Sequence, residues 1–294
     1  MIEKYMIEFR EQIALRFHEI LDFESGSERL SESILYSVRN GGKMLRPVLL
    51  LMSIEAFGQD STKGLNVAVA LEMVHTYSLI HDDLPAMDDD DLRRGMPTNH
   101  KVFGEAMAIL AGDGMLTHAF AVIAEDCGLD VSARLELVRR LSISAGPMGM
   151  VAGQALDMDA TSMVDENIGL ENLKLIHNLK TSKLIEFAVV AGAIIAGQDE
   201  GVISKLEQFA AHLGLAFQIK DDILDFEGDE ALIGKPVGSD DLNEKSTYVT
   251  LSSIDEAKNL LALETEGALR VLDEIPGDTA MLKELVKYLN ERTS

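Results

Sequence analysis

The spacing of apolar residues constrains the fold of this 294-residue chain more than any other feature. Near the N-terminus, Ile13, Phe17 and Leu21 recur at every fourth position, as on one face of an amphipathic helix. The chain holds six prolines, and none lies between residues 147 and 236. No sustained run of alternating apolar and polar residues with flanking hairpin turns indicates a strand. The sequence therefore predicts an all-α bundle of ten or more helices, in a single domain over residues 1–294.

Composition excludes several classes of protein. With 26 Lys and Arg against 50 Asp and Glu, the net charge is −24, which argues against a nucleic-acid-binding surface. Cys127 is the only cysteine, so an intramolecular disulfide and a Cys-rich metal site are excluded. Acidic residues interrupt the segment 1–12, so we do not expect a signal peptide there. The longest apolar run, 187–197, is shorter than the roughly 20 residues of a membrane span, so we expect a buried helix there and a cytoplasmic protein.

The first of two aspartate clusters follows an apolar helical segment. It consists of Asp82, Asp83 and the run 88–91. Because Pro85 cannot continue a helix, we expect Asp82 at a helix end, with Asp88 folded back toward it from the next turn. Six acidic side chains so close together repel one another unless a cation neutralises them. A solvated acidic loop is the alternative for this cluster when it is considered alone.

The second cluster, 139 residues after the first, consists of Asp221, Asp222 and Asp225. Asp221 and Asp225 are one helical turn apart, so their carboxylates can converge on one ion. Clusters that offer only oxygen ligands suit hard cations, Mg²⁺ above all. Two such clusters, each next to apolar sequence, favour a pair of magnesium sites over two solvated loops.

Basic residues stand beside these clusters and beside glycine turns. Mg²⁺ that is held by few carboxylates usually completes its coordination with substrate phosphates, so separate cations should bind those phosphates. The candidates are Lys43 and Arg46 after the pair Gly41-Gly42, Arg93 and Arg94 after the first cluster, and Lys180, Lys183, Lys235 and Lys245. For any single lysine, a solvated surface charge remains the alternative.

Two further groups of polar residues lie in otherwise apolar helical segments. His75, Ser78 and Asp82 are spaced to share one helical face, so a role for His75 near the first cluster and that of an ordinary core histidine are both open interpretations. Gln154 and Asp157 are open to two interpretations, a hydrogen bond between buried helices or a supporting role at the site.

Together these segments resemble the bacterial farnesyl diphosphate synthase group of trans-polyprenyl diphosphate synthases. The stretch from His75 to His100 is similar to the group's first aspartate-rich motif, and the stretch from Ala216 to Asp225 to its second. Five other segments resemble the remaining motifs in order: 41–47, 153–159, 180–188, 234–241 and 244–248. The resemblance covers roughly residues 40–250 and departs at Met44, where the group usually has arginine.

The resemblance implies an isoprenoid-synthase fold with a central active-site cavity, a homodimer, and head-to-tail prenyl transfer assisted by about three Mg²⁺. An allylic diphosphate would ionise to a cation, which isopentenyl diphosphate would attack through its double bond before a proton is lost. The main metal ligands would be Asp82, Asp88 and Asp221. Supporting ligands, orienting or bound through water, would be Asp83, Asp222 and Asp225.

The same resemblance implies two substrate sites. The cations that bind the allylic diphosphate would be Arg93, Lys180, Lys235 and Lys245. The residues that bind isopentenyl diphosphate without metal would be Gly42, Lys43, Arg46, His75 and Arg94. Oxygens of Thr181 and Gln218 would face the allylic cation and stabilise it through their dipoles. No protein base is evident, so the released diphosphate would take the proton.

Product length depends on bulk one to two turns before Asp82. Tyr77 and the adjacent Ser78 occupy these positions, and a bulky aromatic residue there resembles synthases of the fifteen-carbon farnesyl product. The alternatives are a geranylgeranyl or other short-chain synthase and, from another class, a catalytically inactive acidic interaction subunit. A terpene cyclase would lack the second aspartate motif and the Gly-Gly-Lys segment, and both are present.

Overall fold

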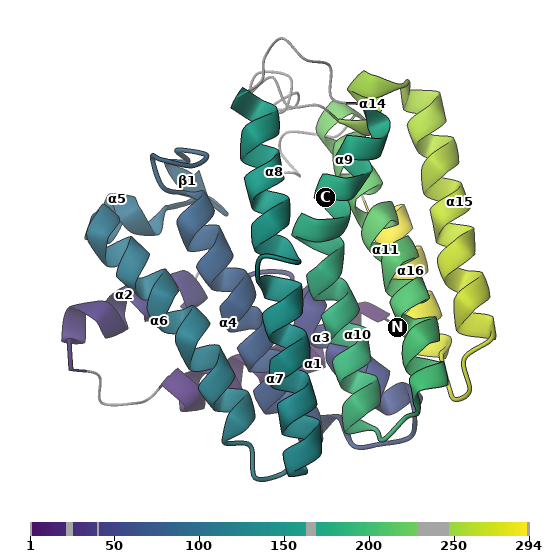
Figure 1. Ribbon diagram of the computed structural model, residues 1–294, viewed down its shortest axis with the longest axis horizontal. Coiled ribbons are helices and arrows are strands. Elements are labelled where there is room, and N and C mark those ends of the chain that lie inside the picture. The colour runs from purple at the N-terminus through teal and green to yellow at the C-terminus, as the bar shows by residue number, and fades with distance from the viewer. Residues whose placement is uncertain (1, 22–25, 40, 163–168, 228–246, 293–294) are drawn as a thin grey trace. The chain divides into compact units, whose positions relative to one another are not determined.

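The structure is a computed structural model that describes residues 2–21, 26–39, 41–162, 169–227 and 247–292. Most of these residues lie in α-helices, and the prediction of an all-α fold with ten or more helices is confirmed (Figure 1). The elements up to residue 145 are α1 (Ile2–Leu21), α2 (Glu28–Arg39), α3 (Leu45–Ala56), the 3₁₀ turn η1 (Ser61–Gly64), α4 (Leu65–Asp82), α5 (Asn99–Phe103), α6 (Glu105–Ala124) and α7 (Val131–Ala145). The later elements are α8 (Met150–Ser162), α9 (Leu170–His177), the π-helical turn η2 (Asn178–Ser182), α10 (Lys183–Ile195), α11 (Glu200–Glu227), α14 (Tyr248–Leu251), α15 (Ile254–Asp273) and α16 (Ala280–Glu291).

The chain forms two compact units. The first contains residues 3–51 and 60–139, and the second contains residues 52–59 and 140–294 as far as they are described. Of the three boundaries between these ranges, 51/52 falls inside α3, 139/140 falls inside α7, and 59/60 falls between α3 and η1. A single domain over residues 1–294 stays a prediction.

In the first unit, α4 packs along α6 (Figure 1). Nearly every residue of α4 from Val67 to Val74 is inaccessible to solvent, because the helix is apolar on all sides. α4 is thus a buried helix of the first unit, and its C-terminal end carries the start of the first aspartate motif.

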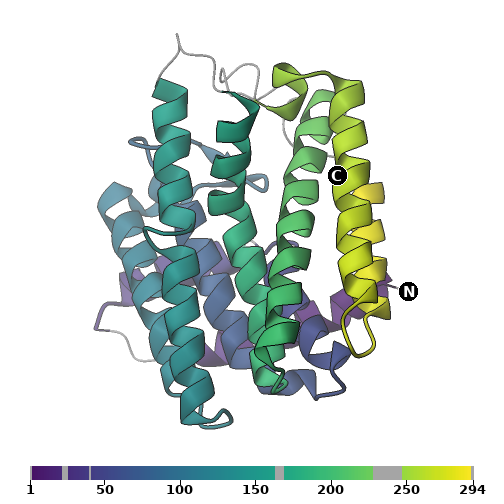
Figure 2. The same ribbon diagram turned by 45° about the vertical axis from the view of Figure 1, so that its right-hand side comes forward.

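In the second unit, α11 packs against both α10 and α15, as Figure 2 shows. The residues from Phe187 to Ala193 of α10 are buried, so the prediction of a buried helix for the apolar run is confirmed. α11 carries the second aspartate motif near its C-terminal end, where Asp221 and Asp225 lie one turn apart as predicted.

A short hairpin after the first aspartate motif was not expected from the sequence. Strands β1 (Leu92–Arg93) and β2 (Met96–Pro97) pair antiparallel around a two-residue turn. Arg94 and Gly95 in this turn have φ values of 55° and 76°, as a type I′ hairpin requires. Strands of two residues are too short to show an alternation of apolar and polar residues. For this reason the sequence pattern gave no sign of a strand here.

One described helix, α6, is long and apolar enough to cross a membrane by length and composition alone. Core helices of proteins without a membrane span meet the same criterion. Ile109 and Leu110 of α6 are 43% and 52% exposed, so part of its apolar surface is left uncovered within this chain.

Candidate active site

The first aspartate motif lies at the end of α4. The backbone N–H of Asp88 donates to the carbonyl oxygen of Asp82 over 2.9 Å, so the chain folds back after Pro85 as predicted. The Asp82 side chain is partly accessible and that of Asp88 is exposed. Both carboxylates are therefore reachable by an ion from solvent.

Asp83 has a different environment, since only 3% of its surface is exposed. Its Oδ1 accepts from Nε of Arg93 at 2.6 Å, and Arg93 also approaches Asp90 at 3.5 Å. Burial raises the pKa of Asp83 and Arg93 opposes the rise. Burial alone would lower the pKa of Arg93, but the Asp83 carboxylate outweighs it and raises that pKa. Asp83 and Arg93 thus hold the hairpin against the end of α4.

A group that sequence reasoning missed lies beside this motif. Ligand atoms of Asp89, Asp91 and His100 lie within 4.8 Å of one another, so these residues could hold a divalent metal ion. Lys101 already neutralises Asp91 over 2.5 Å, and this hydrogen bond lowers the pKa of Asp91. In the sequence, only the resemblance of the stretch that ends at His100 indicated that this histidine belongs with the aspartates. The hairpin that brings His100 close to them was not predicted.

Four of the residues predicted to bind isopentenyl diphosphate lie together in the first unit. Nη1 of Arg46 lies 3.4 Å from Nε2 of His75. The guanidinium of Arg94 lies against Gly42, where a Cβ would be 2.6 Å from its two terminal nitrogens. A side chain at this position would require the Arg94 guanidinium to shift. Lys43, the fifth predicted residue, is exposed.

His75 is uncharged in this cluster. Burial and the neighbouring arginines, Arg46 first, lower the pKa of His75 well below its usual value. Because a guanidinium can only donate, Nε2 of His75 accepts from Arg46 and the proton resides on Nδ1. Ser78, predicted to share the face of His75, instead donates its hydroxyl to the His75 carbonyl at 2.8 Å.

Tyr77, the predicted determinant of product length, is 6% exposed. Its ring lies edge-on to that of His81, with 5.6 Å between centroids. His81 in turn donates from Nε2 to the carbonyl of Ile109 on α6 at 3.1 Å and lies against Gly112. Burial, with a contribution from Asp82, raises the pKa of Tyr77 to about 12. Tyr77 is thus a neutral, tightly packed ring below the first motif.

In the second unit, the segment 153–159, which resembles one of the family motifs, supports Lys180. Nζ of Lys180 donates to Oδ2 of Asp157 at 2.6 Å. One turn earlier on α8, a Cβ on Gly153 would lie 2.2 Å from the backbone nitrogen of Lys180. Gly153 therefore lets α8 approach the π-helical turn η2, and Asp157 orients the ammonium group that this turn presents. This result favours the supporting role over a bond between buried helices for Asp157.

Thr181 and Gln218 also meet in this unit. The Thr181 hydroxyl donates to Oε1 of Gln218 at 3.2 Å, so the two oxygens predicted to face a cation are adjacent. A Cβ on Gly214 would lie 2.2 Å from the Ser182 hydroxyl, and the absence of this atom brings α11 close to η2. π-helical turns occur often at functional sites, but the sequence offered no signal for this one.

The second aspartate motif is bound by protein groups from later in the chain. Oδ1 of Asp221 accepts from Nη2 of Arg292 at 2.5 Å. Oδ2 of Asp222, which is 5% exposed, accepts from the backbone N–H of Tyr248 at 2.8 Å. Thr247 caps α14 through a reciprocal capping box with Thr250. Asp222 thereby fixes the start of α14, and one of its two oxygens is committed to the fold.

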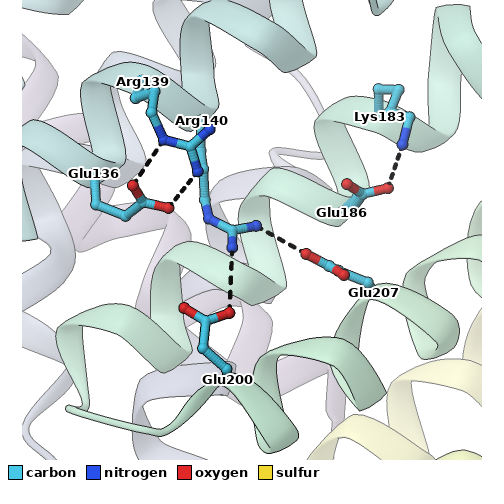
Figure 3. A network of polar contacts seen from close by, with 7 residues as sticks. All are labelled: Glu136, Arg139, Arg140, Lys183, Glu186, Glu200 and Glu207. Atoms are coloured by element: carbon cyan, nitrogen blue, oxygen red, sulfur yellow. Dashed lines mark hydrogen bonds and ion pairs between the residues drawn. The ribbon is translucent and has the colours of Figure 1, made fainter.

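Two predicted cations, Lys235 and Lys245, lie outside the described residues. Lys183 pairs with Glu186 on its own helix at 2.7 Å. Figure 3 shows this contact together with a second set of ion pairs that is not connected to it. In that network, Arg140 of α7 binds Glu207 and Glu200 of α11 at 2.8 and 3.9 Å. Arg140, Glu200 and Glu207 lie outside both aspartate motifs and outside the basic segments beside them.

The donor set fits a hard divalent cation. Asp82 and Asp88 in one unit, and Asp221 and Asp225 in the other, offer carboxylate oxygens with accessible or partly accessible side chains. Oxygen ligands of this kind are those that Mg²⁺ prefers. Asp83 and Asp222 are less suited to direct ligation because both are buried, at 3% and 5% exposed, and each uses an oxygen in an internal bond.

Comparison with known proteins agrees with these features. The family model described as polyprenyl synthetase matches residues 27–289. The chain is 50% identical over 293 residues to the farnesyl diphosphate synthase of Geobacillus stearothermophilus, covering 99% of this chain and 98% of the relative. It is 42% identical over 266 residues to a chloroplastic geranylgeranyl pyrophosphate synthase of Catharanthus roseus, covering 90% of this chain and 74% of the relative. The apo crystal structure of an FPP/GFPP synthase from Zymomonas mobilis superposes with a TM-score of 0.87 at 35% identity, covering 98% of each chain.

Proposed function

The chain belongs to the polyprenyl synthetase family, and we propose that it condenses isopentenyl diphosphate with dimethylallyl and then geranyl diphosphate to give farnesyl diphosphate. Its fold is the all-α isoprenoid-synthase fold. The observation that carries the proposal is that one helix, α4, presents both kinds of site. His75 with Arg46 and Arg94 forms an anion site, and Asp82 with Asp88, one to two turns later, forms a metal site.

Mg²⁺, with about three ions per site, would be held by Asp82, Asp88, Asp221 and Asp225. When bound, the metal neutralises the charge that develops on the leaving diphosphate. The protein cations Arg93 and Lys180, with Lys235 and Lys245, bind the same diphosphate. Arg93 and Lys180 are held by Asp83 and Asp157, which orients both cations for the diphosphate.

The reaction begins when the bond between C1 and oxygen of the allylic substrate breaks and its electron pair leaves with the diphosphate. Oxygens of Thr181 and Gln218, which lie 3.2 Å apart, stabilise the resulting cation through their dipoles. The double bond of isopentenyl diphosphate, held by Arg46, His75 and Arg94, then forms the new carbon–carbon bond. A proton leaves C2 of this substrate and passes to the released diphosphate, so no protein base is required.

A fifteen-carbon product is favoured over the twenty-carbon alternative for two reasons. Tyr77 is a buried aromatic ring one to two turns before Asp82. The chain is also more similar to a farnesyl synthase than to a geranylgeranyl synthase, at 50% against 42% identity. An inactive interaction subunit is disfavoured because the described part of the chain retains the aspartates and cations of both motifs.

The direct test is incubation with isopentenyl and dimethylallyl diphosphates and Mg²⁺, with and without chelator, followed by chromatography of the products. We expect farnesyl diphosphate only when Mg²⁺ is present. Asp82→Asn should lose activity by roughly a hundredfold or more, since it removes a charged group acting on the transition state. Glu207→Gln, which alters only the network of Figure 3, should remain active. An inactive wild-type chain under these conditions would refute the enzyme assignment.

The assembly and location of the protein are also proposals. A homodimer is supported by the uncovered apolar residues Ile109 and Leu110 on α6, which an identical partner would bury. Light scattering of the purified chain should then give twice the mass of the 32.1 kDa chain. We also propose a cytoplasmic location, which fractionation of cells that produce the protein would test.

A further inference from the structure

Glu72 is a buried acid beneath the anion site. It lies on α4 one turn before His75, and only 5% of its surface is exposed. Its Oε2 has no hydrogen-bond partner. A buried carboxylate in this state is costly unless opposite charges or a proton compensate it, so the position calls for a physical explanation.

The charges that act on Glu72 come from two other elements. The positive charges are those of Arg46 on α3 and of Arg94 in the turn of the hairpin, and the neutral His75 lies on α4 itself. Among the described residues, no further charged group has a comparable effect on it. Burial raises the pKa of Glu72 to about 7, and the two arginines oppose this rise. The charge of Glu72 is therefore balanced by the two guanidinium groups that we assign to isopentenyl diphosphate.

We propose that Glu72 is the counter-charge of the anion site: it balances the positive charges of Arg46 and Arg94, and it takes up a proton when a diphosphate binds there. The incoming anion then balances both arginine charges in place of the carboxylate, and one proton from solvent adds to the carboxylate. No other bond forms or breaks. The inference rests on the proposed function for the identity of the ligand, and Glu72 is a positioning residue that does not touch the reacting atoms.

The sign of the pH effect follows from this exchange. Because binding takes up a proton, affinity is highest where Glu72 is already neutral and falls as pH rises above the pKa of the empty site, about 7. Glu72→Gln is neutral at every pH. This variant should therefore bind the diphosphate with the same affinity as the wild type at about pH 6. At about pH 8.5 its affinity should be roughly tenfold higher than that of the wild type, which corresponds to a difference of one unit in the pKa of Glu72 between the empty and the filled site.

The probe is inorganic pyrophosphate in the presence of chelator, with binding measured by titration calorimetry. The affinity ratio of wild type to Glu72→Gln cancels the ionisation of pyrophosphate itself. Arg94→Gln should lose the pH-dependent part of binding, which identifies the site. Glu207→Gln is the matched control, because it also removes a carboxylate from an arginine, Arg140, and it should follow the wild type at both pH values.

Calorimetry of the wild type in buffers of different ionisation enthalpy provides a second measurement that needs no variant. We expect net proton uptake near pH 8. The proposal is overturned if uptake is absent, if Glu72→Gln keeps the wild-type pH dependence, or if it is weaker by the same factor at every pH, as a purely structural role predicts.

Failure of this inference is distinguishable from failure of the proposed function. A chain that makes farnesyl diphosphate but binds pyrophosphate without the Glu72-dependent pH effect refutes the role of Glu72 alone. A chain that shows the pH effect but makes no prenyl product refutes the proposed function and leaves the role of Glu72 intact.

Discussion

At the scale of single residues, the packing of Tyr77 predicts the product length. Its ring is 6% exposed and lies edge-on to His81, which α6 anchors through the Ile109 carbonyl. Tyr77→Ala removes the ring and opens space that a longer prenyl tail can fill, so we expect products beyond fifteen carbons. Chromatography of dephosphorylated products measures the shift.

Tyr77→Phe is the control, because it keeps the ring and removes only the hydroxyl. It should make the wild-type product. If Tyr77→Ala yields only the fifteen-carbon product, Tyr77 is an ordinary core residue and the limit on chain length lies elsewhere.

Spacing in the sequence located the candidate ligands but not their partners. The fold-back of Asp88 toward Asp82 was predictable, because Pro85 stops a helix and only a short turn separates the two residues. The partners of Asp221 and Asp222 are Arg292 and the N–H of Tyr248, which follow 71 and 26 residues later. Periodicity encodes neighbours within one helix, and such remote pairs depend on tertiary packing.

At the scale of elements, Gly153 controls the contact between α8 and η2. A Cβ at this position would lie 2.2 Å from the backbone nitrogen of Lys180, and backbone cannot move aside as a flexible side chain can. Gly153→Ala should lower the free energy of unfolding by about 1–3 kcal/mol and reduce activity by displacing Lys180. Thermal denaturation and kinetics measure the two effects.

Gly114 on α6 offers the opposite case. A Cβ there would lie 3.6 Å from Cδ1 of Ile34, an ordinary contact, and alanine is the better helix former by about 1 kcal/mol. Gly114→Ala should therefore raise the free energy of unfolding. Equal effects of the two substitutions would contradict the close approach of α8 to η2.

The long helices were predictable, but the short irregular elements were not. α10 follows from an unbroken apolar run, and the end of α4 follows from Pro85. The hairpin at residues 92–97 and the π-helical turn at 178–182 depend on contacts with distant residues. Arg94 adopts a positive φ in the hairpin, and its guanidinium lies over Gly42, a relationship that no local pattern contains.

The contact between the end of α16 and α11 predicts an effect on metal affinity. The Arg292 side chain is 6% exposed, binds Asp221, and lies 4.5 Å from the centroid of the Phe217 ring. A metal ion bound to Asp221 competes with this guanidinium for the charge of the carboxylate. Arg292→Met should therefore bind Mn²⁺ more tightly, by about tenfold, since a charge-assisted hydrogen bond contributes about 1.5–3 kcal/mol.

Titration of Mn²⁺ followed by electron paramagnetic resonance measures this affinity directly. Lys287→Met is the control, because Lys287 pairs with Glu284 on α16 itself and the substitution also removes one positive charge. Unchanged or weaker Mn²⁺ binding by Arg292→Met would mean that Asp221 is not a metal ligand, or that Arg292 supports it.

At the scale of the whole molecule, the net charge of −24 has two components. Nine aspartates lie in the two motifs, and the remaining excess of acid is spread along the chain, where it favours solubility. Protein cations or a backbone N–H already bind several of the nine, as Arg93 binds Asp83 and Arg292 binds Asp221. These bonds relieve repulsion within the motifs, so we expect the fold to persist without metal.

This expectation separates the role of metal in activity from any role in folding. Chelator should abolish product formation while circular dichroism and the melting temperature stay at the wild-type values. Mg²⁺ with pyrophosphate, at about a hundred times its dissociation constant, should stabilise the folded chain by about 2.7 kcal/mol, which raises the melting temperature by roughly 5 °C or more. Asp82→Asn should lose most of this rise and Glu207→Gln should retain it. If chelator alone unfolds the chain, the internal bonds of the two motifs are insufficient, and the aspartate clusters need metal for the fold as well as for the reaction.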